Sequence, residues 1–157
     1  MAVAGDSAGG HLVLNVTSLA ICRQFRIPDI ILLHYPNTTN NQNRFLPSAL
    51  LSLDDEMLSG RFLQYASQAL IHKGGSTTNN FFVSPNYTPD HILRQFPPTR
   101  IYVAEIDPLR DYIFSFALKL KKLGNDCKVH LFKEYIHGFC QFDDKNLSVQ
   151  EYENARK

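Results

Sequence analysis

The sequence has few cysteines, no long apolar run and almost no net charge. Its three cysteines, Cys22, Cys127 and Cys140, are odd in number and widely spaced, and no C-x-x-C pair occurs. This usage argues against a disulfide framework and against a zinc knuckle, and it predicts a reducing, intracellular compartment. A formal net charge of +1 gives no indication of the basic surface with which proteins bind nucleic acid. No apolar run approaches the roughly 18 residues of a membrane-spanning helix.

What the chain does contain is an alternation of apolar strands and amphipathic helices. We predict strands at 1–4, 30–35, 100–105 and 128–134, and helices at 11–22 and 111–123. The continuous apolar run at 30–35 is typical of a strand that is buried on both faces. A capping box at Ser148 predicts a last helix that runs to Lys157. This order of elements predicts an α/β fold with four parallel strands and crossover helices.

One connection, residues 37–98, is much longer than the roughly twelve residues that a crossover needs. Much of it is polar and rich in asparagine, and it holds an amphipathic segment at 58–71. Insertions of this kind in α/β folds usually form lids or substrate-binding elements. We therefore expect residues 37–98 to be a lid-type insertion within a single domain.

The motif Gly5-Asp6-Ser7-Ala8-Gly9 matches G-x-S-x-G, the turn that carries the nucleophile in serine hydrolases. In that turn the serine sits between a strand and a helix, and glycines two residues to either side avoid a collision. An apolar strand precedes the motif and a periodic helix follows it, which is the required context. We expect Ser7 to be the nucleophile and the Ala8 backbone N–H to be one oxyanion donor.

A serine nucleophile needs a histidine base and an acid that orients the base. In α/β-hydrolases these follow in the order serine, acid, histidine, each just after a strand. Asp107 follows the third predicted strand and His137 follows the fourth, at the sheet edge where α/β sites lie. We therefore expect Asp107 to be the acid and His137 the base.

Other acids and histidines remain as alternatives. Asp111 rivals Asp107, but it opens the following helix, where a carboxylate already stabilises free N–H groups. Glu105 is expected within a strand, and Asp6 is expected to bond the nucleophile turn. The remaining histidines are expected to be structural: His11, His34, His72, His91 and His130.

Three separated segments, Gly5–Gly10, Asp107–Asp111 and His137–Phe139, together resemble the hormone-sensitive lipase family of α/β-hydrolases. The resemblance spans nearly the whole chain. Ser84-Pro85 and Pro97–Thr99 also lie where that family carries similar residues. Three further stretches are similar to the eukaryotic hormone-sensitive lipase branch in particular: Arg26–Asp29, Tyr35-Pro36 and Leu50–Leu53.

The resemblance implies a Ser7-His137-Asp107 triad, a carboxylic-ester substrate, and neither a metal nor an organic cofactor. Eukaryotic relatives act on acylglycerols and sterol esters, often at lipid droplets. The expectation is therefore a cytoplasmic hydrolase whose partners are a small or lipid ester and a droplet surface, not nucleic acid.

The family carries a His-Gly-Gly-Gly oxyanion loop before the nucleophile turn, and this sequence has no such motif. We therefore expect residues 1–157 to be the C-terminal half of a catalytic domain, inactive and poorly folded when alone. Two other interpretations remain open. The chain could be a non-catalytic small-ligand-binding protein on the same scaffold, like the gibberellin-receptor relatives that lost the histidine, or a fragment without function.

Overall fold

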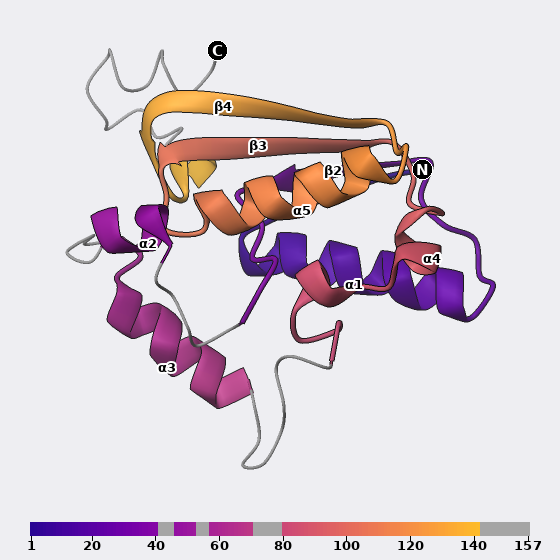
Figure 1. The fold of residues 1–157 in the computed structure, drawn as a ribbon, viewed down its shortest axis with the longest axis horizontal. Helices are drawn as coiled ribbons and strands as arrows, with labels where there is room; N and C mark the ends of the chain where they lie inside the picture. Colours follow the sequence, from indigo (N-terminus) through magenta and orange to yellow (C-terminus); the bar gives the residue numbers. More distant parts are fainter. Residues whose placement is uncertain (41–45, 53–56, 71–79, 142–157) are drawn as a thin grey trace.

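The computed structural model describes residues 1–40, 46–52, 57–70 and 80–141, and its centre is one parallel sheet (Figure 1). The strands lie side by side in the order in which the chain forms them, β1-β2-β3-β4. The bounds of the four strands are Ala2–Asp6 for β1, Ile30–His34 for β2, Thr99–Ile106 for β3 and Cys127–Ile136 for β4. The predicted α/β fold with four parallel strands is confirmed.

Two long helices cover one face of this sheet. Helix α1, Ala8–Cys22, packs against β1 and β2, and helix α5, Arg110–Lys122, packs against β3 and β4. Figure 1 shows both helices on the same side, which right-handed crossovers require when each new strand is added beside the last. The core lies between these two helices and the sheet, and its fully buried side chains include Leu14, Ile31, Leu33, Ile101, Val103, Ile113, Phe116 and Leu120.

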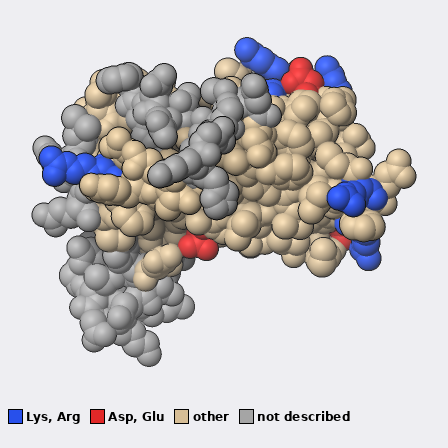
Figure 2. All heavy atoms as spheres, turned by 90° about the horizontal axis from the view of Figure 1, so that it is seen from below, with Lys and Arg blue, Asp and Glu red and all other residues tan. Residues whose placement is uncertain are grey.

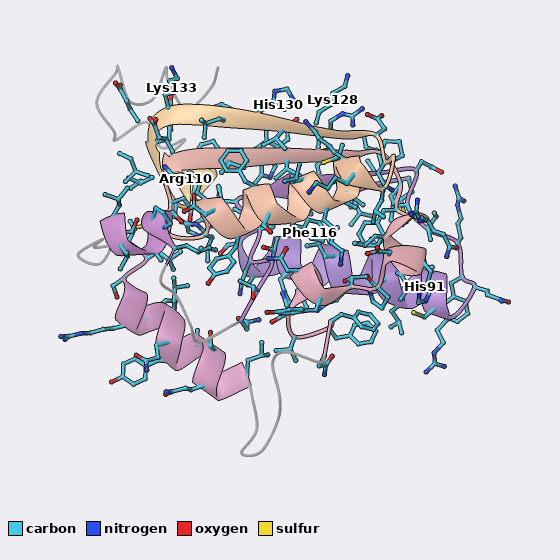
Figure 3. The ribbon with its side chains drawn as sticks, in the orientation of Figure 1. His91, Arg110, Phe116, Lys128, His130 and Lys133 are labelled. Atoms are coloured by element: carbon cyan, nitrogen blue, oxygen red, sulfur yellow. The ribbon has the colours of Figure 1, made fainter. Side chains whose placement is uncertain are left out.

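The opposite face of the sheet is less covered. Along β2, Ile31 and Leu33 are buried, whereas Ile30, Leu32 and His34 are only half-buried. The expectation that this strand is buried on both faces is therefore wrong for the described residues, because α1 and α5 cover the same face. On the open face three rings from neighbouring strands stack, with centroid separations of 4.9 Å for His34–Tyr102 and 5.3 Å for Tyr102–His130. Figure 3 labels His130 on β4.

The long connection between β2 and β3 carries several short elements. These are α2 (Pro47–Leu51), α3 (Gly60–Leu70), the 3-10 turn η1 (Pro85–Tyr87) and α4 (Asp90–Leu93). The amphipathic segment at 58–71 thus forms α3 as far as Leu70, with Leu63 buried and Phe62 and Tyr65 exposed. On the face that Figure 2 shows, charged side chains lie mainly along the outline, and the described residues near the middle are largely uncharged. The predicted helix at 148–157 lies outside the described residues.

Candidate active site

Ser7 lies between the end of β1 and the start of α1, in a backbone conformation that non-glycine residues rarely adopt. Its φ is 50° and its ψ is −112°. Three hydrogen bonds hold this residue: its N–H donates to the His34 carbonyl at 2.9 Å, and its carbonyl accepts from the N–H groups of His11 and Asn37, each at 3.1 Å. These three backbone hydrogen bonds therefore hold Ser7 in its strained conformation.

Two glycines make this turn sterically possible. A Cβ added to Gly5 would lie 2.4 Å from the Gly9 carbonyl oxygen, and one added to Gly10 would lie 2.7 Å from Pro36 Cβ. At Gly9 an added Cβ would meet only the Asp6 carboxylate, at 3.6 Å, which is ordinary contact. The expected collision two residues from the serine is thus found at Gly5 and not at Gly9.

The helix after the nucleophile begins at Ala8, three residues before the predicted start at His11. The glycines suggested a turn because they weaken helices, but here they let the first helical turn pass close to β1 and Pro36. The first N–H groups of a helix have no carbonyl partner within it and lie at its positive pole. The Ala8 N–H therefore lies directly beside Ser7, at the end of the helix where negative charge is stabilised.

The structure brings Ser7 together with the acid and the histidine that the sequence predicts. Asp107 follows the last residue of β3 and His137 follows the last residue of β4. The distance from His137 Nε2 to Ser7 Oγ is 2.9 Å, and the distance from His137 Nδ1 to Asp107 Oδ2 is also 2.9 Å. The Leu109 N–H donates to the other carboxylate oxygen, Asp107 Oδ1, at 2.8 Å.

The acid and the base of this arrangement are both buried. Asp107 is 1% exposed and His137 is 6% exposed. A buried carboxylate beside Nδ1 holds the imidazole in the tautomer with a proton on Nδ1, which leaves the Nε2 lone pair facing the Ser7 hydroxyl. The geometry allows proton transfer from Ser7 Oγ to Nε2, with the resulting positive charge stabilised by Asp107.

The alternative acids have other partners. Asp111 Oδ2 accepts the Ser48 N–H at 2.8 Å, and Asp111 Oδ1 accepts from Arg110 Nε at 3.2 Å. Burial alone would raise the pKa of Asp111, but the hydrogen bonds from Ser48 and Arg110 outweigh it and leave that pKa lowered. Asp111 thus ties α2 to the start of α5, near Arg110 in Figure 3.

Glu105 and Asp6 also bond elsewhere. The Glu105 side chain accepts the Glu134 N–H at 2.9 Å, within the sheet region. The sequence predicts that Asp6 bonds its own turn, but its carboxylate accepts from Gln141 Nε2 at 3.0 Å instead. Gln141 ends the short 3-10 turn η2, Phe139–Gln141, so this bond joins the nucleophile turn to the segment after His137.

The other described histidines lie in different surroundings. His34 and His130 stack on Tyr102 across the open face of the sheet, and His91 is exposed on α4. His11 is buried on α1, and its Nδ1 lies 3.0 Å from the Asn37 carbonyl oxygen. His72 lies outside the described residues.

Sequence reasoning missed Tyr35 as a part of the site. This residue is fully buried, has a φ of 35°, and its ring centroid lies 4.7 Å from that of His137. Burial above all, and then the nearby Cys140 and Asp6, raise the pKa of Tyr35, so its hydroxyl is neutral. The signal that could have found it is its place at the carboxyl end of β2, the edge where α/β sites gather.

Within the described ranges, no group of three or more His, Cys, Asp or Glu side chains is placed to hold a metal ion. None of the helices in those ranges combines the length and the apolarity of a membrane span. The three cysteines are free thiols.

Comparisons with known proteins agree on the family to which this chain is similar. A family profile described as alpha/beta hydrolase fold matches residues 1–141. An esterase of Gibberella moniliformis is 30% identical over 153 residues, which covers 89% of this chain and 44% of that protein. The hormone-sensitive lipase of Mus musculus is 31% identical over 77 residues, which covers 47% of this chain and 10% of that protein.

A solved structure agrees with this result. The crystal structure of carboxyl esterase 2 from the mycorrhizal fungus Tuber melanosporum superposes with a TM-score of 0.83 at 27% identity, covering 99% of this chain and 54% of that one. This chain therefore spans about half the length of the relatives that it matches from end to end. The family profile and the shared fold together show that the chain belongs to the alpha/beta-hydrolase family.

Proposed function

We propose that this chain carries the Ser-His-Asp triad of a carboxylic-ester hydrolase, with Ser7 as nucleophile, His137 as base and Asp107 as acid. The observation that carries the proposal is the unbroken series of hydrogen bonds from Ser7 Oγ through His137 to Asp107, at 2.9 Å each. Esterases among the relatives support the same reaction class.

The proposed reaction has two halves. In the first, Ser7 Oγ attacks the ester carbonyl carbon while its proton moves to His137 Nε2, and Asp107 stabilises the imidazolium. The Ala8 N–H stabilises the oxyanion from the end of α1. The proton then passes from Nε2 to the leaving alcohol, which leaves an acyl group on Ser7. In the second half, water attacks this acyl-enzyme with His137 again as base; the bond to Ser7 Oγ then breaks, the proton returns from Nε2 to Ser7 Oγ, and the carboxylic acid is released.

We further propose that residues 1–157 act as part of a longer catalytic domain. The chain matches only 44% of the Gibberella esterase and 54% of the Tuber esterase. Two surfaces of the described part fit this proposal: β1 lies at the edge of the sheet, and α1 exposes Leu12, Val16 and Leu19. Both would be covered if more of the sheet continued beyond β1.

The insertion at 37–98 is proposed to shape the substrate site. Its helix α2 is bonded to the segment that carries the acid, because Ser48 Oγ donates to the Pro108 carbonyl at 3.2 Å and the Ser48 N–H donates to Asp111. Met57 lies beside the residue that follows the base, since its Cε would be 3.5 Å from a Cβ on Gly138. The insertion is therefore attached near both Asp107 and His137.

The substrate class is proposed to be a lipid ester such as an acylglycerol, as in the hormone-sensitive lipase branch. That branch is matched over 47% of this chain. The insertion exposes large apolar side chains that could contact an acyl chain or a droplet surface: Leu50, Leu51, Phe62, Tyr65 and Leu70. A droplet-associated, cytoplasmic location belongs to the same proposal.

The hydrogen bond between Ser7 and His137 favours an enzyme over a ligand-binding protein on the same scaffold, because binding alone needs no base. A fluorophosphonate probe on the intact natural protein tests this choice. We expect covalent labelling that disappears in Ser7→Ala and persists in Ser115→Ala, a matched change at an exposed serine on α5. Full labelling of Ser7→Ala would refute the proposed nucleophile.

A further inference from the structure

His11 belongs to a chain of hydrogen bonds that ends on the strained nucleophile residue. The Asn37 N–H donates to the Ser7 carbonyl at 3.1 Å. The carbonyl of the same residue, Asn37, lies 3.0 Å from His11 Nδ1. One side chain on α1 thus holds the residue whose N–H holds Ser7.

The network fixes which nitrogen of His11 carries the proton. Asn15 Nδ2 donates to the Phe82 carbonyl at 2.6 Å, so this atom is the amide nitrogen and not the oxygen. The same nitrogen lies 2.9 Å from His11 Nε2, which must therefore accept. In a neutral imidazole the other nitrogen then carries the proton, and Nδ1–H donates to Asn37.

The surroundings favour this neutral form. His11 is 8% exposed, and burial lowers its pKa more than the nearby backbone carbonyls of Asn37 and Phe82 raise it. A proton on Nε2 would also face the Asn15 amide, so that two donors would oppose each other. The donor toward Asn37 is therefore present whenever the ring is neutral.

We propose that His11 is a positioning residue for the nucleophile: its Nδ1–H holds the Asn37 carbonyl and so fixes the backbone of Asn37, and the N–H of Asn37 in turn holds the Ser7 carbonyl and so the direction of Ser7 Oγ toward His137. This inference rests on the proposed function. The strained φ of Ser7 makes the support necessary, because such a conformation persists only when its neighbours enforce it. A displacement of about 1 Å at a reacting atom can cost roughly 100-fold in rate.

The kinetic test compares two substitutions at His11 in the intact protein with p-nitrophenyl butyrate as substrate. His11→Leu replaces the imidazole by an apolar side chain and so removes the N–H that donates to Asn37. His11→Asn instead supplies an amide N–H that can reach the Asn37 carbonyl. We expect kcat to fall roughly 10- to 100-fold in His11→Leu with KM nearly unchanged. His11→Asn should restore kcat to within about threefold of the wild type, and His91→Leu and His91→Asn, at an exposed histidine, should change neither constant.

Two further measurements do not depend on activity. Nitrogen-15 NMR of the imidazole should show the proton of His11 on Nδ1 at neutral pH. Amide hydrogen exchange should accelerate at Asn37 in His11→Leu, while Leu33 within β2 keeps its wild-type protection.

The outcomes separate this inference from the proposed function. A wild-type protein that neither hydrolyses the ester nor reacts with the fluorophosphonate overturns the function, and the NMR and exchange results still decide the role of His11. A proton on Nε2, equal losses of kcat in His11→Leu and His11→Asn, or unchanged exchange at Asn37 would each overturn the positioning role.

Discussion

The substitution Asp107→Asn is the sharpest test of the triad, because the structure dictates how the new amide must lie. Asp107 Oδ1 accepts the Leu109 N–H at 2.8 Å, while Oδ2 faces His137 Nδ1 at 2.9 Å. Turning the amide nitrogen toward Leu109 would oppose two buried donors, which costs about 1–3 kcal/mol. The amide oxygen therefore stays on Leu109, and the amide nitrogen faces His137.

This orientation gives His137 the wrong tautomer. The amide N–H donates to Nδ1, so the imidazole proton moves to Nε2, which then has no lone pair for the Ser7 proton. An equivalent substitution in a serine protease lowers kcat by about 10⁴. We expect a loss of the same order here, equivalent to about 5.4 kcal/mol of transition-state stabilisation.

The assay is steady-state hydrolysis of p-nitrophenyl butyrate by the intact protein, together with urea unfolding. Asp111→Asn is the matched control, because it makes the same chemical change four residues further along and affects only the contacts with Ser48 and Arg110. We expect it to cost some stability and to leave kcat within about tenfold, because Asp111 touches neither Ser7 nor His137 directly. A variant Asp107→Asn that folds and retains a tenth of the wild-type rate, or a larger loss of kcat in Asp111→Asn, would refute the assignment.

Three further predictions follow from the site. Gly5→Ala should abolish probe labelling because its Cβ would lie 2.4 Å from a backbone oxygen, whereas Gly9→Ala should keep most of it because its Cβ meets only one side-chain oxygen at 3.6 Å; equal effects would contradict the steric argument. The pKa of Asp111 is lowered in the folded state, so its bond to Ser48 should contribute stability above about pH 4 that is lost as the pH falls through the lowered pKa; urea unfolding from pH 5 to pH 2 should show a smaller loss in Asp111→Asn. Tyr35→Phe should keep kcat within about threefold, whereas Tyr35→Ala should lower kcat, because the ring packs on the base. Unfolding curves should show Tyr35→Ala destabilised by about 3–5 kcal/mol. An equal loss of kcat in both variants would assign the effect to the hydroxyl.

The parts of the molecule that local patterns specify could be predicted from the sequence. The strands were visible as apolar runs, and the rule that α/β sites gather at carboxyl strand ends placed Asp107 and His137 beside Ser7. Their catalytic roles stay a prediction. Boundaries were less accurate, because whether α1 starts at Ala8 or at His11 depends on its approach to Pro36, which lies on another element.

The supporting contacts could not be predicted, because each joins residues that are far apart in the chain. Ser48 and Asp111 are separated by 63 positions, and Asn37 meets His11 across 26. Nothing in the composition around Ser48 or Asn37 signals these pairings, since each uses a backbone group that nearly all residues possess. Tyr35 looked like the last residue of an apolar strand until the fold placed its ring beside His137.

The strand order has a consequence for how this site is completed during folding. Each strand pairs with the one made just before it, yet Ser7 Oγ meets a ring that lies 130 positions later. The serine and its strained turn can form early, while the base arrives only after β4 has docked on β3. Pairings this distant in sequence slow folding. Reaction with an activity-based probe would therefore report more than chemistry: it would mark the moment at which strands β1 to β4 have assembled, and its time course after refolding could follow the docking of β4.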